Sequence, residues 1–347
     1  MKLADVAKAA GVSQGTASNV FNRPEIVRAE VRDRVRAAAR AIGYAGPDVK
    51  ARALRAGKVN AIGVASADPL SYFFDDPYAR MLMSGIAEAC DERGAGLSLV
   101  SANNDERLAW NIQNALVDGF ILFCVSSGPR LVRLTRQRRL PFVALELGHD
   151  DASIAAIGID DVAGARLAAR HLAELGHRRF AIVALSFPEQ PVGRISRADI
   201  EAAAYPVTRK RLRGYSEVLA EYGIDANAIP IIGGHDEDAE LRAGLEELFA
   251  SPQPPTAILS MSDRAAFVIL DWLAARGIAV PDDVSVVGFD GVPEGETSRP
   301  PLTTIAQPIK RIGRLAVETI MEHDGPARQE QLDAHLVVRR STAPPKG

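Results

Sequence analysis

Two short helical patterns joined by a glycine open the chain, where residues 3–22 read LADVAKAAGVSQGTASNVFN. Apolar side chains recur at helical spacing until Gly11, which breaks the first helix. Ser13 is a favourable N-cap for a second helix that runs from about Gln14 to Phe21. Two short helices joined by such a turn form a supersecondary unit that reads DNA, so the pattern predicts a helix-turn-helix.

A third helical pattern follows and ends at Gly43. Its apolar positions are Val31, Val35, Ala38, Ala39 and Ile42, and its arginines lie mostly away from them. Three such helices can bury one small core, which predicts a head over residues 1–47 followed by a linker over residues 48–58. From this pattern alone, an ordinary three-helix cap with solvated charges is the alternative interpretation.

The distribution of charge separates these two interpretations. Residues 1–58 contain twelve Lys and Arg against five Asp and Glu, whereas the rest of the chain contains twenty-nine against thirty-nine. The net charge of −3 for the whole chain conceals this segregation. A basic module on an acidic body is the electrostatic pattern of a DNA-binding protein and favours the helix-turn-helix.

Length and composition limit the class of protein. A chain of 347 residues is too long for one ordinary core and suits a small head plus a body of two domains. Cys90 and Cys124 stand in apolar segments, where we expect buried free thiols rather than a disulfide or a metal site. The N-terminus is too charged for a signal peptide, and no apolar run approaches the roughly 20 residues of a membrane span. We therefore expect a cytoplasmic protein with no cofactor, no metal and no membrane contact.

From residue 59, short apolar runs alternate with helical patterns, which is typical of a parallel sheet covered by helices. The expected strands lie near 59–65, 96–101, 120–125 and 141–147, and again near 180–185, 229–232, 257–260 and 284–289. The segments 303–306, 308–321 and 334–339 are too few for a third domain and should complete the two sheets. The predicted fold class is α/β, with a three-helix head and a body of two parallel, helix-covered sheets.

Polar residues that directly follow the expected strands are the candidates for a binding site. In open parallel sheets, ligands bind in the crevice at the carboxyl ends of the strands. These candidates are Glu146, Ser262, Asp263 and Asp290, each of which has a helix cap or a solvated loop residue as its alternative role. Residues 189–207 show no convincing periodicity, so we expect a long surface loop, as an ordinary insertion rather than a lid.

Several runs together match one family. They are LADVAKAAGVS (3–13) with TAS (16–18), IGY (42–44), ARALR (51–55), HLAELGHRR (171–179), VPDDVSVVGFD (280–290) and PPLTTIAQP (300–308). With these runs in order, the chain resembles the lac and gal repressor family of bacterial transcription regulators, the LacI/GalR type, along essentially its whole length. The resemblance implies a homodimer that reads a near-palindromic operator, and a periplasmic-binding-protein-like body with a small-molecule effector between two subdomains. The expected subdomains are 59–159 with 292–320, and 160–291 with 321–341.

The resemblance also implies roles in DNA binding. It assigns base reading to Gln14, Gly15 and Asn19. Because Gly15 has no side chain, Gln14 and Asn19 would read bases directly, and the side chains of both suit bidentate pairing with adenine. The implied phosphate contacts are Ser13, Thr16, Ser18 and Asn22. The match at Ala51, Arg52, Ala53 and Leu54 implies a hinge helix that orders on DNA, with Leu54 wedged into the minor groove.

For the effector, the implied residues are Phe74, Asp75, Phe123, Glu146, Arg211, Ser262, Asp263, Asp290 and Gln307. An arginine among acidic groups suits a polyol, so a sugar or a sugar derivative is the first choice. A purine or nucleoside corepressor is the alternative, with Tyr72, Phe73, Phe74 and Phe123 available for stacking. The chain departs from the family at Ser262-Asp263, where Asn-Asp is common, and in its unusual residues 73–76, so effector identity is not inherited.

Two other classes of protein fit less well. An enzyme would need a phosphate-binding glycine fingerprint, a metal-spaced cluster or a nucleophile elbow, and the sequence contains none, so we expect no catalytic residues. A sugar-binding transport protein shares the two-sheet body but lacks a DNA-binding head. The C-terminal residues 341–347 contain no leucine heptads, so a tetramer built through the tail is not expected. Repression relieved by an inducer is the commoner arrangement in this family, although linkage permits either sign of control.

Overall fold

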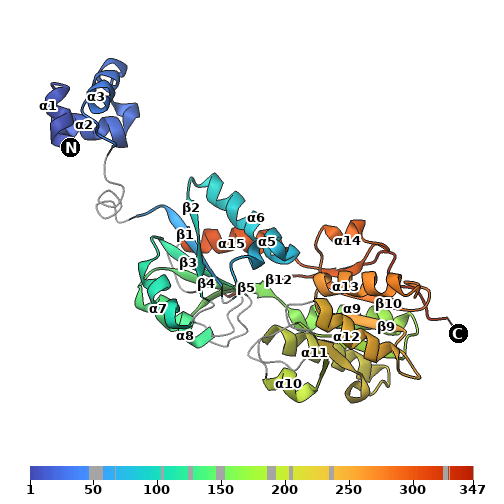
Figure 1. The fold of residues 1–347 in the computed structure, drawn as a ribbon. Coiled ribbons are helices and arrows are strands. Elements are labelled where there is room, and N and C mark those ends of the chain that lie inside the picture. Colours follow the sequence, from blue (N-terminus) through green and yellow to red (C-terminus); the bar gives the residue numbers. More distant parts are fainter. Residues whose placement is uncertain are drawn as a thin grey trace. The chain divides into compact units, whose positions relative to one another are not determined.

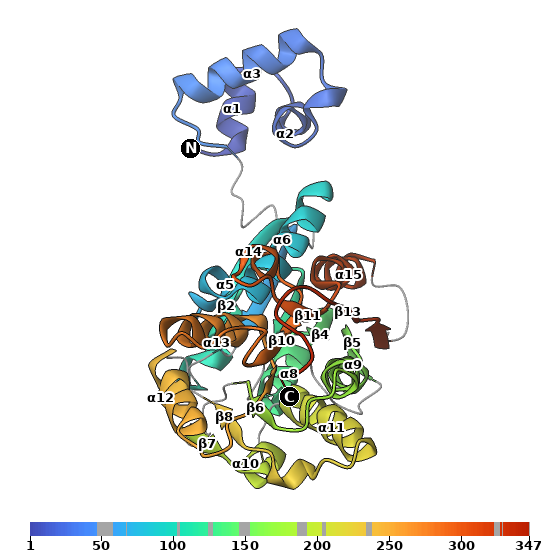
Figure 2. The same cartoon turned by 90° about the vertical axis from the view of Figure 1, so that its right-hand side faces the viewer.

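The chain divides into two compact units, Met1–Val59 and Asn60–Gly347. The computed structural model describes residues 1–46, 58–66, 68–102, 105–123, 128–145, 153–185, 193–202, 206–233, 238–322, 327 and 329–346. Figure 1 draws both units as ribbons, and Figure 2 shows them after a quarter turn. In these described ranges, no helix combines the length and the apolar character needed to cross a membrane.

The first unit is a three-helix head that agrees with the predicted helix-turn-helix. Its helices are α1 (Leu3–Ala9), α2 (Gln14–Asn22), the short 3-10 helix η1 (Pro24–Ile26) and α3 (Ala29–Ala41). Gly11 ends the turn after α1 with a φ of +62°, a left-handed conformation that favours glycine. Ser13 caps α2 as predicted, because its hydroxyl oxygen accepts the Thr16 N–H at 3.0 Å. One apolar cluster closes the unit, and its buried members are Val6, Ala7, Ala10, Ala17, Val20, Val35 and Ala39.

The second unit begins with a parallel sheet. Within the described residues it has six strands in the order β12-β5-β4-β3-β1-β2, and every neighbouring pair is parallel. The strands are β1 (Ala61–Ser66), β2 (Gly96–Ser101), β3 (Gly119–Phe123), β4 (Phe142–Leu145), β5 (Ala155–Ile159) and β12 (Gln329–Leu332). Its helices are α5 (Tyr72–Asp75), α6 (Pro77–Glu92), α7 (Asp105–Asn114), α8 (Gly128–Gln137) and α15 (Ile309–Met321).

A second sheet follows, and its described residues form seven strands in the order β13-β11-β10-β9-β6-β8-β7. Only the edge strands β7 and β13 run antiparallel to their neighbours in this described part. The strands are β6 (Phe180–Val183), β7 (Gly193–Ile195), β8 (Ile231–Gly233), β9 (Ala257–Ser260), β10 (Ser285–Asp290), β11 (Thr303–Ala306) and β13 (His335–Val337). The helices are α9 (Asp161–Glu174), α10 (Arg197–Ala202), α11 (Pro206–Glu221), η2 (Ala226–Ala228), α12 (Asp238–Phe249), α13 (Asp263–Ala275) and α14 (Glu294–Thr297).

Helices cover both faces of each sheet. Figure 2 shows α9 and α11 on one side of the second sheet and α12 and α13 on the other. The central strands are buried on both faces and read as continuous apolar runs, as parallel strands between two helix layers should. One apolar cluster includes side chains from α6 and α15 of the first half and from α9 and α11 of the second. The prediction of an α/β body with two helix-covered sheets is confirmed.

The described chain passes three times between the two sheets. It crosses at Asp160, between β5 and α9, and again at residues 307–308, between β11 and α15. It crosses for the third time at residues 333–334, between β12 and β13. These three segments join the two halves of the body.

Four sequence predictions differ from the structure. Residues 303–306 were expected in the first subdomain, but β11 pairs with β10 in the second sheet. Residues 329–332 were expected in the second, but β12 pairs with β5 in the first sheet. The strand β5 itself was not predicted. The segment 189–207 was expected to be a surface loop, yet its described part forms β7, which pairs with β8, and α10.

The physical reason is that three of these segments are short and lie at or near a sheet edge. Edge strands are covered on fewer sides, so their sequences need no apolar run: β12 reads Gln-Glu-Gln-Leu and β7 reads Gly-Arg-Ile. Within 193–202, Ile195 and Ile200 are buried and hold β7 and α10 onto the second half. Of the two cysteines, Cys90 is a buried free thiol as expected, and Cys124 lies outside the described residues.

Candidate functional site

The second helix of the head presents the predicted DNA-contacting residues on one surface. Ala17 and Val20 face the core of the head, so the opposite face of α2 points outward. That outer face holds Gln14, Gly15 and Asn22, which are exposed, and Ser18 and Asn19, which are half-buried. The three predicted base-reading residues therefore share one helix face, which is the arrangement that a recognition helix needs.

The predicted phosphate contacts already bind one another within the head. The Ser13 and Thr16 hydroxyls lie 2.9 Å apart, and the Asn22 amide donates to the Ser18 hydroxyl at 3.1 Å. These bonds fix the side chains near both ends of α2. The predicted hinge residues Ala51, Arg52, Ala53 and Leu54 lie outside the described residues, as does the predicted effector residue Glu146.

Arg211 is the centre of the polar cluster in the body. It extends from α11 and is only 4% exposed. Its Nε donates to Asp161 Oδ1 at 2.9 Å, and its Nη1 donates to the Met261 carbonyl and lies 3.8 Å from Asp290 Oδ1. Its guanidinium carbon lies 3.6 Å from the centre of the Phe289 ring, in cation–π contact. Burial lowers the pKa of Arg211, but the carboxylates of Asp161 and Asp290 raise it on balance, so the guanidinium stays charged.

Asp290 ends β10 beside this guanidinium. Its Oδ1 accepts a hydrogen bond from Gln307 Nε2 at 2.9 Å, and its Oδ2 accepts the Asp263 N–H at 3.2 Å. Burial raises the pKa of Asp290 well above its usual range; Arg211 opposes this shift, whereas the negative charges of Asp263 and Asp76 add to it. The structure therefore brings together Arg211, Asp290 and Gln307, three of the residues that the resemblance implies for an effector.

Asp263 and Ser262 hold this end of the second sheet together. Asp263 Oδ2 accepts the Gly291 and Val292 N–H groups at 2.8 and 2.9 Å, and Oδ1 accepts the Thr304 hydroxyl at 2.6 Å. An added Cβ at Gly288 would overlap Asp263 Oδ1, so glycine is needed on β10 for this close approach. Ser262 is the N-cap of α13, because its hydroxyl accepts the Ala265 N–H at 3.1 Å. Both residues are thus engaged in fixing local structure around Asp290.

The first half contributes a carboxylate that the sequence analysis did not identify as a site residue. Asp76 caps α6, where its Oδ1 accepts the Ala79 N–H at 2.9 Å, and it is buried. Burial raises the pKa of Asp76, whereas backbone hydrogen bonding and the charge of Arg264 lower it. The negative charge of Asp76 also contributes to the raised pKa of Asp290, so carboxyls of the two halves interact electrostatically. Arg80 of α6 and Glu294 of α14 add an ion pair between the same halves.

The aromatic residues of the first half form a cluster around Phe123. This ring is fully buried, and Tyr72 and Tyr78 stack against it with centroids 6.1 Å away in each case. Phe73 packs against it at 5.8 Å. The predicted residue Phe74 instead points to solvent, with 64% of its surface exposed, and Asp75 is exposed beside it. The structure thus separates Phe74 and Asp75 from the buried ring of Phe123.

Two buried hydroxyls complete the Arg211 cluster. Thr208 and Tyr215 lie on α11 three residues before and four residues after Arg211, so all three share one helix face. The Thr208 Oγ1 and Tyr215 Oη atoms are buried and have no hydrogen-bond partner in the described part of the chain. Burial raises the pKa of Tyr215, which keeps its hydroxyl protonated and able to donate. Buried polar atoms without partners are costly, so these two are free to bind a ligand.

The residues that sequence reasoning missed are Asp76, Asp161, Thr208 and Tyr215. Asp161 stands two residues after β5, but this strand was not predicted, so no expected strand end pointed to it. Thr208 and Tyr215 follow from the helical spacing around Arg211 once that residue is chosen. In the described ranges, no group of His, Cys, Asp or Glu side chains has an arrangement that could hold a metal ion.

Comparison with known proteins gives the family. The model of the lacI family of bacterial regulatory proteins matches residues 2–46, and that of the periplasmic binding protein-like domain matches residues 169–342. An HTH-type transcriptional regulator of Mycobacterium tuberculosis is 37% identical, and the match covers 99% of this chain and 97% of the relative.

Two solved structures are similar over nearly the whole chain. A complex of the transcriptional regulator CelR with cellobiose has a TM-score of 0.70 at 27% identity and covers 98% of this chain and 99% of its own. A lac repressor dimer bound to operator and the anti-inducer ONPF has a TM-score of 0.78 at 25% identity and covers 99% of both chains. The helix-turn-helix head, the two-sheet body and these matches lead to one conclusion: the chain belongs to the lacI family of bacterial regulatory proteins, and it is a transcription regulator rather than an enzyme.

Proposed function

We propose that this protein is a homodimeric repressor that binds a near-palindromic operator and is controlled by a sugar or a sugar derivative bound at the Arg211 cluster. The observation that carries the effector proposal is the set of polar groups on and beside α11. Arg211 offers fixed donors, its acidic partners accept, and the Thr208 and Tyr215 hydroxyls have no partner in the described chain. A polyol presents hydroxyls that both donate and accept, so it can satisfy all of these groups at once.

The charge of the cluster narrows the class of effector. Four buried carboxyls, those of Asp76, Asp161, Asp263 and Asp290, belong to this cluster. The guanidinium of Arg211 pairs with Asp161 and Asp290, while the charges of Arg264 and Arg339 act on Asp76 and Asp263. A phosphate or carboxylate placed here would compete with Asp161 and Asp290 for the Arg211 guanidinium, so we expect the effector to be neutral or cationic.

Stacking of a purine is less well supported. Phe123 is fully buried and already stacked with Tyr72 and Tyr78, so its ring offers no open face to a base. Phe74 is open to solvent, but it lies apart from that ring. In support of a sugar, the similar CelR structure contains cellobiose. Thermal shift with neutral sugars, amino sugars, sugar phosphates and nucleobases tests this order, and a larger shift with a sugar phosphate or a nucleobase contradicts it.

Operator selection tests the DNA-binding part of the proposal. Purified protein is incubated with fragments of DNA from its own genome, and the bound fragments are sequenced. A homodimer that reads bases through Gln14 and Asn19 should enrich one palindrome, and similar lac repressor crystals contain a dimer on operator. Fragments without a common motif, which moderate salt releases, would contradict specific reading. Leu54→Ala in the same experiment should weaken operator binding, because the proposed minor-groove wedge is lost.

Arg211 variants test the effector site. Arg211→Ala should abolish the change in operator affinity that effector produces, a change of about 5–150-fold in typical allosteric proteins. Because removing a buried cation leaves Asp161 and Asp290 unpaired, Arg211→Lys provides a second variant that keeps the charge but loses the planar fork. Lys210→Ala is the matched control, since Lys210 is exposed on the same helix. Arg211 variants that fold and respond like the control would show that the effector binds elsewhere.

A further inference from the structure

A pocket of about 610 Å³ lies in the second half of the body, at the opposite end of the sheet from the Arg211 cluster. Phe180 opens β6, Pro230 immediately precedes β8, and Pro255 precedes β9, so the pocket is at the amino ends of these strands. Met261, Asp263 and Asp290 stand at the carboxyl ends of the strands instead. The volume is within the range of about 300–1,000 Å³ that is usual for small-molecule sites.

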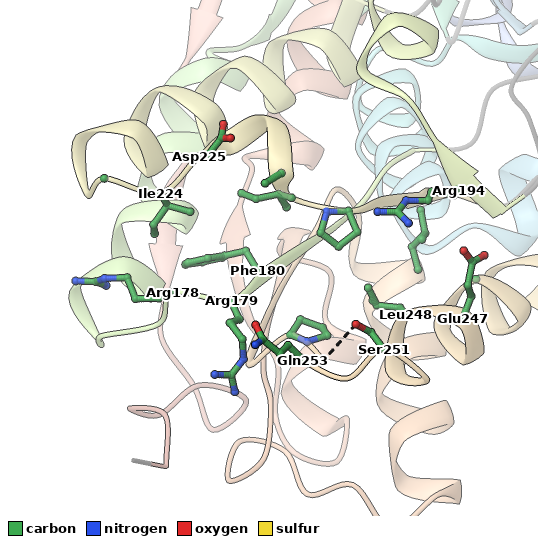
Figure 3. A pocket seen from close by; sticks show the side chains of 17 residues that line it. Arg178, Arg179, Phe180, Arg194, Ile224, Asp225, Glu247, Leu248, Ser251 and Gln253 are labelled. Atoms are coloured by element: carbon green, nitrogen blue, oxygen red, sulfur yellow. Dashed lines mark hydrogen bonds between the residues drawn. The ribbon is translucent and has the colours of Figure 1, made fainter.

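The floor of this pocket is apolar. Figure 3 shows Phe180 in the middle of the lining, with Ile224 on one side and Leu248 on the other. Ile232 lines the same space from β8, and Gly244 of α12 leaves room beside it. An added Cβ at Gly244 would meet Ile232 side-chain atoms at 3.4–3.6 Å, which is ordinary contact. This floor suits an aromatic or branched aliphatic group, because such a surface gains free energy when it leaves water.

Most charged groups at the rim of the pocket are already engaged. Arg178 Nη1 donates to the Ala173 and His177 carbonyls at 3.1 and 2.8 Å. Arg179 Nε donates to the Pro254 carbonyl at 3.1 Å. Asp225 caps η2, where its Oδ1 accepts the Asn227 N–H at 2.9 Å. These side chains hold the rim of the pocket in place.

Arg194 differs from these residues. It lies in the middle of β7, directly opposite Ile232 of β8, so its side chain rises on the same face of the sheet as the apolar floor. Figure 3 shows its guanidinium directed from β7 toward the interior of the pocket. It forms no hydrogen bond or ion pair within the described part of the chain, even though Glu247 also lines the pocket. A guanidinium beside an apolar floor presents two parallel N–H donors with the geometry of a carboxylate.

We propose that this pocket is a second ligand site that binds a small monocarboxylate with an aromatic or branched aliphatic body. The carboxylate pairs with the Arg194 guanidinium, and the apolar body covers Phe180, Ile232 and Leu248. The site is distinct from the Arg211 cluster, whose excess of acidic groups disfavours an anion. The proposal does not depend on the identity of the effector.

Isothermal titration of the full chain with benzoate, and with benzamide as the uncharged analogue of the same size, tests the proposal. Benzoate should bind at one site per chain with a Kd of about 1 mM or tighter, as its few atoms allow. Benzamide should bind about tenfold more weakly, because it lacks the charge-assisted pair with Arg194. An absence of benzoate binding up to about 10 mM overturns the proposal.

Three variants locate the site. Arg194→Gln should weaken benzoate binding about tenfold and leave benzamide binding unchanged, because only the ionic contact is lost. Arg242 also belongs to α12 but does not line the pocket, so Arg242→Gln is the control and should leave the affinities for benzoate and benzamide unchanged. Gly244→Leu fills the space beside Ile232 and should block both ligands, with a thermal melt as the check on folding. Benzoate binding that Arg194→Gln does not weaken places the ligand elsewhere and overturns the proposal.

Discussion

Asp290 occupies a backbone conformation that side chains rarely adopt, with a φ of +134°. This residue is the last of β10, accepts hydrogen bonds from Gln307 and Asp263, and lies beside Arg211. Strain of this kind persists where the surroundings over-determine it, and it is concentrated at functional sites. The resemblance identified Asp290, Gln307 and Arg211, whereas Asp76 could not be connected with them, because nothing in the local sequence indicates that the N-cap of α6 interacts electrostatically with Asp290.

The raised pKa of Asp290 predicts a pH-dependent stability. A carboxyl whose pKa is raised in the folded state binds its proton more tightly there than in the unfolded chain. Its favourable contribution is therefore present in acid and is lost as the pH rises through the folded pKa. Because the side chain of Asp290→Asn does not titrate, the free energy of unfolding of this variant should improve relative to the parent by about 1 kcal/mol or more between about pH 5 and about pH 8.

Urea titrations at the two pH values measure this difference. The test uses the change, between the two pH values, in the difference in free energy of unfolding between variant and parent. The cost of the hydrogen bond from Asp263 N–H that the amide loses is present at both pH values and cancels to first order. Asp75→Asn is the matched control, because Asp75 is exposed in the first half. A gap between variant and parent that stays constant or shrinks at higher pH would refute the assignment of a raised pKa.

At the scale of elements, the crossing of α6 and α15 shows what periodicity can and cannot predict. Helices were expected between the strands of the body, but which helix packs against which was not predicted. The helices α6 and α15 approach closely because Gly85 and Gly313 lie at their contact. An added Cβ at Gly85 would overlap the Lys310 backbone, and an added Cβ at Gly313 would overlap the Leu82 carbonyl. Central strands were predicted well, since burial on both faces demands apolar residues. The edge strands β7 and β12 were not, since each buries only one apolar side chain, Ile195 in β7 and Leu332 in β12.

The crossing makes a prediction about stability. Gly85→Ala should lower the free energy of unfolding by about 1–3 kcal/mol, because the backbones of α6 and α15 must separate to admit the methyl group. Gly244→Ala is the matched control in another helix, where the added Cβ makes only ordinary contacts, and it should raise stability by about 0.4–1 kcal/mol. Chemical denaturation of both variants measures the two changes in the free energy of unfolding. Equal effects at the two sites would mean that the helices are not in close contact.

At the scale of the whole molecule, head and body are separate compact units, each with its own apolar core. Deletion of residues 1–58 should therefore leave a folded body that binds effector as the full chain does but has no affinity for operator. Titration calorimetry with the effector and a gel-shift assay with operator measure the two properties on the same preparation. A truncated body that no longer melts cooperatively would mean that the head contributes to the stability of the body.

The three passages of the chain between the two sheets, at Asp160, residues 307–308 and residues 333–334, have a mechanical consequence. A single connection would allow one half to rotate in any direction relative to the other. Three connections instead leave rotation about one axis as the main low-energy movement. Ion pairs such as Arg80–Glu294 can then break and re-form during this rotation, because the three connections keep the two halves together. A small molecule that moves the two halves apart or together therefore has few alternative movements available. A modest binding free energy is then enough to produce one reproducible change in their arrangement.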